Sequence, residues 1–494
     1  TPIQPRLAES NLFILEGGGP QALAFNEFNP LFARNRLALQ ASAIAGSNNT
    51  FGDEVTQSGI WGKLSYSLGQ FHFETDGFRD NNDITHDIYN VFIQGNASPK
   101  LGLQAEARHR ETEHGDLEYN FDLNRFSPIL RRDVRTDSVR VGAQLAPTPH
   151  STFIASAIYQ DEREEQQGRA RQFFTEQGYI AEGQYLFRET RFGLVAGGGY
   201  YDVDIESSTF GETATRHSNG YFYAHVRYPY QATWTVGVSI DSLDDGIIGE
   251  FHHVNPKFGM MWDITPNTTL RLAAFETLKR PLLTDQTIEP TQLAGFNQLF
   301  DDLGGTESKR FGIALDQKFS SSLYGGVEVS ERKLAVPIAV GVSDVFTTDW
   351  EEESYRMYLD WAPFTNVAFS MEYQLEHFDN EDEFVRDVPG TRTHIAPVTV
   401  RYFHPSGIFS TLTTTYVNQK VDFGVTEIGD DEFILVDAGI GYRLPKRYGI
   451  VKLQVRNVFD NDFNYQALGF RTLEREALPF LPERTLLAQI TLAF

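Results

Sequence analysis

Apolar and polar residues alternate with a period of two over much of this chain. In Val367–Leu375 the odd positions are mostly apolar, and the even positions are small or polar. The same alternation runs through residues 312–319, 451–456 and 486–494. Because side chains of a strand point alternately to its two faces, this pattern predicts β-strands with one apolar and one polar face.

Short segments rich in Pro, Gly or Asn join these runs in pairs. Proline presets the dihedral of a turn and stops strand pairing from continuing. The segments are Ala97–Lys100, Pro147–His150, Pro229–Gln231, Thr265–Asn267, Ala362–Thr365, His404–Gly407 and Pro445–Arg447. At the other ends of the pairs we expect longer, charged connections that hold Asp161–Glu165, Asp241–Asp245, Asp349–Glu353, Asp379–Glu383 and Gly429–Glu432.

Short turns on one side and long loops on the other are typical of bacterial outer-membrane barrels. We therefore predict an all-β fold, a transmembrane antiparallel up-and-down β-barrel of about 22 strands with short periplasmic turns and long extracellular loops. The barrel is expected to cover residues 35–494, with its first strand near Asn35 and its last ending at Phe494. These two strands should pair with each other, because lipid tolerates no free sheet edge.

Residues 1–34 show no such alternation. Gly17–Pro20 would break any regular element. The segment is predicted to be a periplasmic linker or a short lumen insert, with the linker favoured for residues 1–20 and both interpretations open for Ala22–Phe32. Thr1 follows no charged and apolar leader, so we expect a mature chain from which a signal peptide has been removed.

Composition narrows the function classes. No run of roughly 18 apolar residues is present to form a transmembrane helix. Aromatic residues make up 13% of the chain, including 39 Phe and 21 Tyr, which suits aromatic girdles, although a large β-sandwich or propeller would also fit. The 494 residues include no Cys, so disulfides, thiolate metal sites and a Cys nucleophile are excluded.

Charge and motifs argue against other activities. A net charge of −25 disfavours binding to nucleic acid, which requires a basic face. The chain has no zinc-protease, nucleophile-elbow or phosphate-loop motif, so we predict no enzyme activity, no cofactor and no metal site. The acidic segments are interpreted as solvated loops rather than calcium sites, because their spacing does not follow a calcium loop.

Two stretches carry motif residues. They are Asn255–Gly259, Trp262, Thr265–Leu272 and Arg280 in the first, and Val455–Asn461, Tyr465, Pro482–Arg484 and the terminal Phe494 in the second. Together they resemble the barrel domain of the TonB-dependent receptor-like outer-membrane proteins, over roughly residues 35–494. The resemblance implies that Phe494 is the signal read by the barrel-assembly machinery.

The sequence also departs from that family. Its members carry a plug domain and a TonB-engaging box before the barrel, and residues 1–34 show neither. Pro-Glu-Arg stands at 482–484 where the family usually has Pro-Gly-Arg. In addition, Phe28–Phe32 running into Arg34–Arg36 resembles the junction in export proteins whose barrel follows a periplasmic helical-repeat region.

The phase of the alternation predicts a set of charged side chains that line the lumen. They are Lys63, Glu74, Glu106, Arg108, Arg140, Lys318, Glu328, Arg356, Asp360, Glu372, Arg401, Lys452 and Arg456. Such a wall would set selectivity. The alternative is that these charges pair with one another across neighbouring strands and have no role in selectivity.

A barrel of this size without a plug needs something to fill its lumen. The candidates are a partner protein, residues 1–34, or the long segments 113–136, 281–305 and 460–483 folding inward; the alternative is that these segments stand outside. We interpret Trp61, Trp234, Trp262, Trp350, Trp361 and Tyr221–Tyr223 as girdle residues at the lipid face.

Three functions remain open. The first is an outer-membrane channel or conduit for transport or export of a solute or polymer. The second is a TonB-dependent-type uptake receptor whose plug is absent from this chain, and the third is a structural or adhesive barrel. The expected partners are outer-membrane lipid and lipopolysaccharide, the barrel-assembly machinery, and a periplasmic or plug protein, but no nucleic acid.

Overall fold

The computed structural model describes residues 37–209, 211–280, 283, 286–298, 302–340, 344–380, 390–422, 428–467 and 480–494. The segment 1–34, predicted to be a linker or lumen insert, lies outside these residues. Within them, no helix has the length and apolar character needed to cross a membrane.

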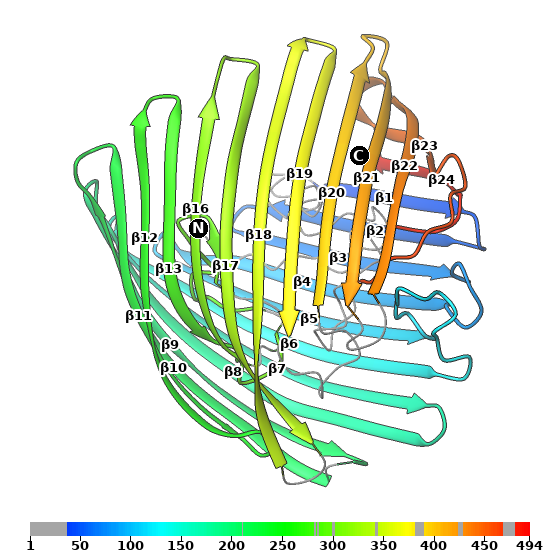
Figure 1. Ribbon diagram of the computed structural model, residues 1–494. Helices are drawn as coiled ribbons and strands as arrows, with labels where there is room; N and C mark the ends of the chain where they lie inside the picture. Colours follow the sequence, from blue (N-terminus) through cyan, green and yellow to red (C-terminus); the bar gives the residue numbers. More distant parts are fainter. Residues whose placement is uncertain are drawn as a thin grey trace.

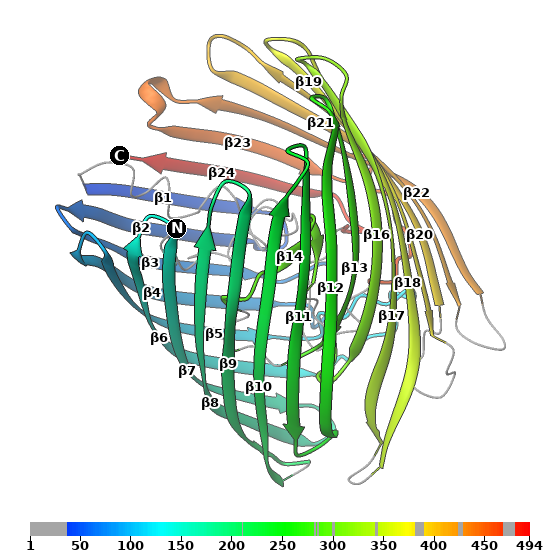
Figure 2. The same ribbon diagram turned by 90° about the vertical axis from the view of Figure 1, so that its left-hand side faces the viewer.

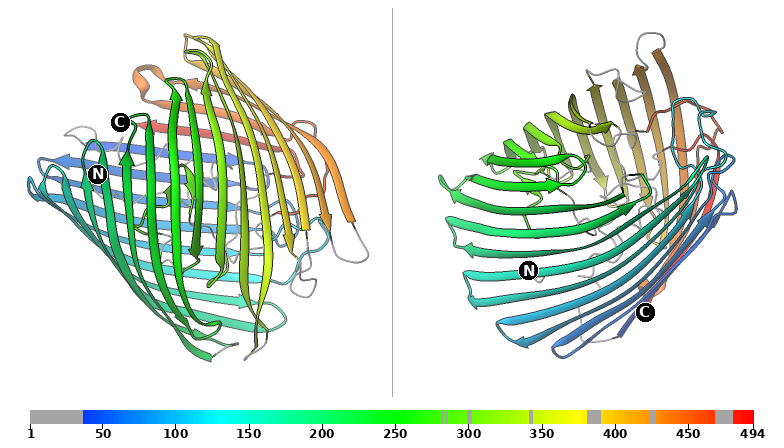
Figure 3. Two further views of the ribbon diagram at one scale, coloured as in Figure 1. Left: turned by 60° about the vertical axis from the view of Figure 1, so that its left-hand side comes forward. Right: turned by 90° about the horizontal axis from the view of Figure 1, so that it is seen from below.

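The strands form one closed barrel. A 22-stranded antiparallel sheet follows the chain order around the molecule (Figure 1). It closes where β1 pairs with β24, from Gln40 opposite Ala493 to Gly46 opposite Leu487. Backbone hydrogen bonds between Leu39 and Phe494, 3.1 and 2.8 Å long, extend this seam. Figure 3 shows β1 in blue beside β24 in red. The predicted fold is confirmed, and the sheet has no free edge.

The elements of the barrel have the following bounds. The strands of the first half are β1 Leu37–Gly46, β2 Phe51–Trp61, β3 Leu64–Thr75, β4 Ile84–Ser98, β5 Leu101–His114, β6 Arg131–Thr148, β7 Ser151–Gln167, β8 Arg171–Arg188, β9 Phe192–Ser207, β10 Gly211–Arg227, β11 Ala232–Asp245 and β12 Gly249–Thr265. Those of the second half are β13 Thr268–Leu278, β16 Glu307–Lys318, β17 Leu323–Val340, β18 Asp344–Phe364, β19 Val367–Asn380, β20 Gly390–Phe403, β21 Ile408–Asp422, β22 Ile428–Arg443, β23 Gly449–Arg456 and β24 Thr485–Ala493. A separate two-stranded hairpin, β14 Gln292–Leu293 with β15 Phe296–Asn297, and a short 3₁₀ helix, η3 Pro445–Arg447, complete the fold.

All seven Pro- or Gly-containing turns predicted from the sequence are present. Each joins an even-numbered strand to the next strand, as between β4 and β5 or between β22 and β23. They therefore share one edge of the barrel, which is also the edge where β1 begins and β24 ends. In the short-turn, long-loop arrangement of outer-membrane barrels this edge is the periplasmic one.

The charged segments differ from their predicted position. Asp161–Glu165, Asp241–Asp245, Asp349–Glu353 and Gly429–Glu432 lie within β7, β11, β18 and β22, and not in loops. The strands continue through them because each side chain still has a cross-strand neighbour, as in Lys333 opposite Glu351. Of the fifth segment, Asp379 and Asn380 are the last two residues of β19, and residues 381–383 lie outside the described residues. The long connections are 115–130, 279–306 and 457–484.

The two faces of the sheet are unlike. On β16, Phe311, Ile313 and Leu315 are 38–55% exposed, whereas Ala314, on the opposite face, is buried. A row of exposed apolar side chains faces outward in this way, as a lipid-facing belt requires. Trp61, Trp262 and Trp361 are exposed and Trp234 is half-buried, and all four share this outer face with Phe222.

Three of the predicted girdle residues face inward instead. Trp350 is 3% exposed and packs with Leu334, Val336 and Phe378. Tyr221 and Tyr223 are 5% and 1% exposed and contact residues of the β14–β15 hairpin. The prediction was wrong for these residues because it assumed that large aromatic side chains face only lipid.

Wall height varies around the barrel. At the seam, β23, β24 and β1 have 8, 9 and 10 residues. Across the barrel, β17 and β18 have 18 and 21 residues. The wall is therefore lowest where the sheet closes.

Candidate functional site

We call the connection between β13 and β16, residues 279–306, the lumen loop, because its described residues 286–298 lie inside the barrel. Its β14–β15 hairpin lies inside the barrel, behind β11 and β12 in Figure 2. Leu293 and Phe296 of this hairpin are 2% and 1% exposed. They pack against inner-wall side chains of three strands: Tyr221, Tyr223, Ala273, Phe275 and Ala314.

Two glycines of the inner wall make room for the hairpin. A Cβ added to Gly312 would overlap the Phe296 ring, and one added to Gly259 would lie 3.0 Å from Leu293 Cγ. Glycine inside a strand often marks a site where another backbone or side chain approaches closely. The wall therefore has sockets for the two apolar side chains of the lumen loop.

Polar contacts hold the described residues between 286 and 289. Glu182 on β8 accepts hydrogen bonds from Thr287 Oγ1 at 2.5 Å and from the Ile288 backbone N–H at 3.0 Å. Gln184 donates to the Ile288 carbonyl, and Arg140 donates to Gln286. This part of the loop is thus tied to β6 and β8, which lie several strands away from β13 along the sheet.

A buried ion pair fixes the start of the lumen loop. Arg280, 4% exposed, lies 2.8 Å from Glu289 and 4.0 Å from Asp241. Glu289 also accepts hydrogen bonds from Tyr223 at 2.9 Å and from Asn219 at 3.1 Å. Burial alone would lower the pKa of Arg280, which lies beyond the end of β13, but the Glu289 and Asp241 carboxylates hold it above its ordinary value.

Two other connections close over the seam. Residues 115–130 and 457–467, which we call the seam cover, meet in an aromatic cluster with Phe433 and Leu435 of β22. The rings of Phe433 and Phe463 stack with centroids 4.0 Å apart, and Tyr119 contacts Tyr465 at 6.2 Å. Burial raises the pKa of Tyr119.

Hydrogen bonds complete the seam cover. Gln419 of β21 is fully buried; it accepts from the Gln466 N–H at 2.6 Å and donates to the Gln466 carbonyl at 3.0 Å. On the other side of the seam, Arg79 lies 3.6 Å from Asp116. Burial lowers the pKa of Arg79, and Asp116 opposes that shift. The cover therefore bridges β21–β22 to the β3–β4 connection, above the lowest part of the wall.

The C-terminal motif has a structural role at this point. Asn457 has a positive φ of 48° and is 2% exposed. Its side chain accepts from the Asn461 N–H at 2.9 Å and donates to the Asn461 carbonyl at 2.8 Å. Arg484 donates its backbone N–H to Asp460 at 2.7 Å. These contacts join the end of β23 to the start of β24.

Described residues of all three long segments therefore fold inward or over the opening, as one of the predicted alternatives has it. Sequence reasoning missed several residues that anchor them, among them Glu182, Glu289 and Gln419, and assigned Tyr223 to the lipid face. Arg280 had been singled out as part of a motif, and Arg140 as a lumen-lining charge. The others contact residues distant in sequence, as Glu182 does with Ile288, 106 positions later, so no local pattern signals them.

Most of the predicted lumen-lining charges occupy inward positions. On the face that carries the buried Glu106 and Arg140 lie Glu106, Arg108, Arg140, Lys318, Glu328, Arg356, Asp360, Glu372, Arg401, Lys452 and Arg456. Many contact one another or another wall residue. Arg356 lies 2.6 Å from Glu372, Arg271 lies 3.0 Å from Glu328, and Arg108 lies 3.6 Å from Glu106.

Lys63 and Glu74 are placed elsewhere. Lys63 lies in the turn between β2 and β3. Glu74 pairs with Phe51 and shares the outward face of β3 with Leu68. The phase was misread because Phe71 and Phe73 on this strand face inward, where they pack with Ile44 and Ile88.

Phe494, predicted to be an assembly signal, is 57% exposed and lies at the outward face of the seam. Its ring centroid lies 6.1 Å from that of Tyr448. Its role in assembly stays a prediction.

Comparison with known proteins agrees with this architecture. Residues 75–306 match the family described as TonB dependent receptor-like, beta-barrel. This part of the barrel is therefore similar to the barrel of the TonB-dependent receptor-like proteins. The protein lies in the outer membrane of a Gram-negative bacterium. A search of curated protein sequences found no match.

Solved structures share the fold of this barrel. The FrpB iron transporter from Neisseria meningitidis (F3-3 variant) superposes with a TM-score of 0.73 at 12% identity, covering 94% of this chain and 83% of that one. The siderophore receptor PirA from Pseudomonas aeruginosa gives 0.68 at 11% identity, with 93% and 81% covered. The copper transporter OprC gives 0.72 at 12% identity, with 93% and 80% covered. These relatives are transport receptors and not enzymes.

Proposed function

We propose that this barrel transports a selected solute across the outer membrane through a lumen that its own connections narrow. The observation that carries the proposal is the lumen loop, whose hairpin is seated in the wall sockets at Gly259 and Gly312. A loop held by buried apolar contacts and by the Arg280–Glu289 pair leaves less of the cross-section open than 22 bare strands would. This arrangement favours a receptor-type transporter over an open conduit.

Planar-bilayer conductance of the purified chain tests the proposal. We expect low conductance from the intact protein and large, steady steps when residues 286–298 are replaced by a short Gly-Ser linker. Replacing the β7–β8 turn, residues 168–170, with a similar linker is the matched control and should leave conductance low. Large steps from the intact chain would instead favour the conduit.

The inward charges are proposed to stabilise the wall more than to select ions. Arg356 and Glu372, on neighbouring strands, illustrate this, since each neutralises the other at 2.6 Å. Because the pair has no net charge, the double variant Arg356→Gln/Glu372→Gln of the linker-substituted channel should change its cation-to-anion permeability ratio little. A strong shift in reversal potential would show that the wall charges act on passing ions.

A further inference from the structure

A row of basic side chains crosses the outer face of the barrel where β19, β20 and β21 lie side by side (Figure 1). His377 on β19 lies directly opposite Arg392 on β20, and Arg392 lies directly opposite Lys420 on β21. On β20, Arg392 shares its face with the exposed Val398, whereas Thr393 points inward and is 1% exposed. The three basic side chains, which we call the basic row, therefore project outward.

The flanking carboxylates pair with the ends of the basic row and not with its centre. Glu353 lies 3.8 Å from His377, and Asp430 lies 3.6 Å from Lys420. Arg392 is exposed, and within the described part of the chain it takes part in no ion pair. Because like charges directly opposite each other destabilise a sheet, Arg392 and Lys420 call for a counterion between them.

Arg216 on β10 shows how this barrel surrounds another outward arginine. Its two cross-strand neighbours are Asp202 and Asp244, and its guanidinium lies 3.5 Å from Asp202. The cross-strand neighbours of Arg392 are both basic residues instead. The basic row is therefore a place where the protein leaves positive charge for a ligand to balance.

The height of the basic row places it at the upper edge of the apolar belt. Arg392 is ten residues from Tyr402, which is 38% exposed on the same face next to a periplasmic turn. At a rise of about 3.3 Å per residue and a tilt of about 40°, ten residues span about 25 Å along the barrel axis, which is the height of that belt. Three of the four outward positions between them are small and apolar, namely Ala396, Val398 and Val400. The basic row thus faces the head groups of the outer leaflet, and the positions below it face acyl chains.

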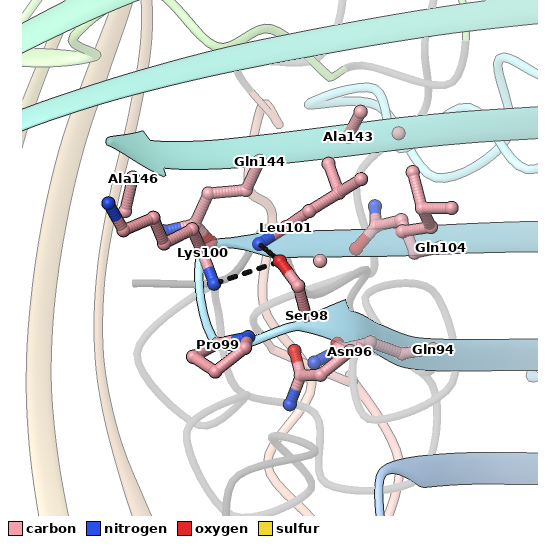
Figure 4. Close-up of a pocket in the computed structure, with 13 residues that line it drawn as sticks. Gln94, Asn96, Ser98, Pro99, Lys100, Leu101, Gln104, Ala143, Gln144 and Ala146 are labelled. Carbon is pink, nitrogen blue, oxygen red and sulfur yellow. Dashed lines mark hydrogen bonds between the residues drawn. The ribbon is translucent and has the colours of Figure 1, made fainter.

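The cavity in the inner wall offers no comparable site for an anion. It has a volume of about 190 Å³, lies between β4, β5 and β6, and has the carboxamides of Gln94, Asn96, Gln104 and Gln144 in its lining (Figure 4). Among the described residues that line it, Lys100 alone is charged. An anion with several oxygens is matched better by the adjacent cations of the basic row.

We propose that the basic row binds a phosphate group of a lipopolysaccharide molecule in the outer leaflet, with the acyl chains of that lipid lying along the apolar positions of β20. The Arg392 guanidinium offers two parallel N–H donors to two phosphate oxygens, and Lys420 adds a second positive charge. The phosphate offsets the repulsion between these two side chains. The proposal does not depend on the transported solute, because the basic row lies outside the lumen.

Native mass spectrometry of the full chain, refolded free of lipid in a non-ionic detergent, measures this binding. The probe is bisphosphorylated lipid A, and lipid A from which both phosphates have been removed is the comparison. We expect saturable binding of the phosphorylated lipid and roughly tenfold weaker binding of the dephosphorylated one. Inorganic phosphate at millimolar concentration should not displace the lipid, because it makes no contact with the apolar positions of β20.

Arg392→Gln should weaken the binding of lipid A roughly tenfold, because the phosphate loses its charge-assisted hydrogen bonds. Arg216→Gln is the matched control: it removes the same charge from an outward arginine that lies between two carboxylates, and it should leave binding unchanged. Heat-modifiable migration in gel electrophoresis checks that each variant is a folded barrel. Equal binding of the dephosphorylated lipid, displacement by inorganic phosphate, unchanged binding in Arg392→Gln, or an equal loss in Arg216→Gln would overturn the proposal.

Discussion

Removing the Phe296 side chain should release the lumen loop while leaving the barrel intact. The ring is 1% exposed, fills the space over Gly312, and lies 5.4 Å from the Arg271 guanidinium and 5.7 Å from that of Arg310. Truncating a buried Phe to Ala typically costs about 3–5 kcal/mol. Cation–π contacts of this kind add about 0.5–1 kcal/mol each at exposed sites.

This loss acts on the hairpin and not on the whole fold, because the strands keep all their ladder hydrogen bonds. Taking about 4 kcal/mol, and a factor of ten per 1.4 kcal/mol, the open population of the hairpin should rise roughly a thousandfold. A thiol placed at Ala273, which lies 5% exposed beneath the hairpin, reports that opening. Its labelling rate in the otherwise cysteine-free chain should increase by the same factor in Phe296→Ala.

Phe311→Ala is the matched control. Phe311 is adjacent to Gly312 but is 55% exposed on the outer face, so the same chemical change should not open the hairpin. If Phe296→Ala left the labelling rate unchanged, or if Phe311→Ala raised it equally, the socket argument would be wrong.

Three further predictions concern other contacts. Glu289→Leu should destabilise the lumen loop by about 3–5 kcal/mol, because it leaves Arg280 buried without its closest partner. The double variant Arg280→Met/Glu289→Leu should recover much of that loss; the labelling rate at Ala273→Cys measures both variants, and additive losses would contradict the pairing. Gln419→Leu should leave the Gln466 backbone groups unpaired at a cost of about 1–3 kcal/mol and make residues 457–467 more sensitive to protease. Unchanged cleavage would show that Gln419 does not anchor this segment. Ile313→Lys on the outer face should lower the free energy of unfolding in lipid by up to about 2–4 kcal/mol, and Thr413→Lys on the inner face should have little effect; equal effects in a urea titration would refute the assignment of faces.

Local sequence patterns were sufficient for the barrel itself. Period-two runs and the turn at Pro99 or Pro266 depend only on residues close in sequence, so strand number, order and closure followed from them. The pattern failed where the inner face is also apolar. On β3, Phe71 and Phe73 point inward, and this reversed the expected position of Glu74.

The lumen could be predicted only in outline. That long connections fold inward was one of two alternatives, and their length suggested it. Which wall residues receive them depends on contacts such as that between Glu182 and Ile288, which no local spacing encodes. The contact of Phe296 with Gly312 likewise exists only in the folded barrel, so neither residue signals it in the sequence.

The uneven height of the wall bears on the order in which the barrel unfolds and assembles. The strands from β22 to β1 have the shortest registers: β22 pairs with β23 only over Ala438–Arg443 and β1 with β24 only over Gln40–Gly46, so fewer ladder bonds hold these strands than hold β17 to β18. With rising temperature, the barrel should therefore open first in this region beside the seam. The seam cover contacts residues on both sides of the seam. It can therefore form only after β24 has paired with β1.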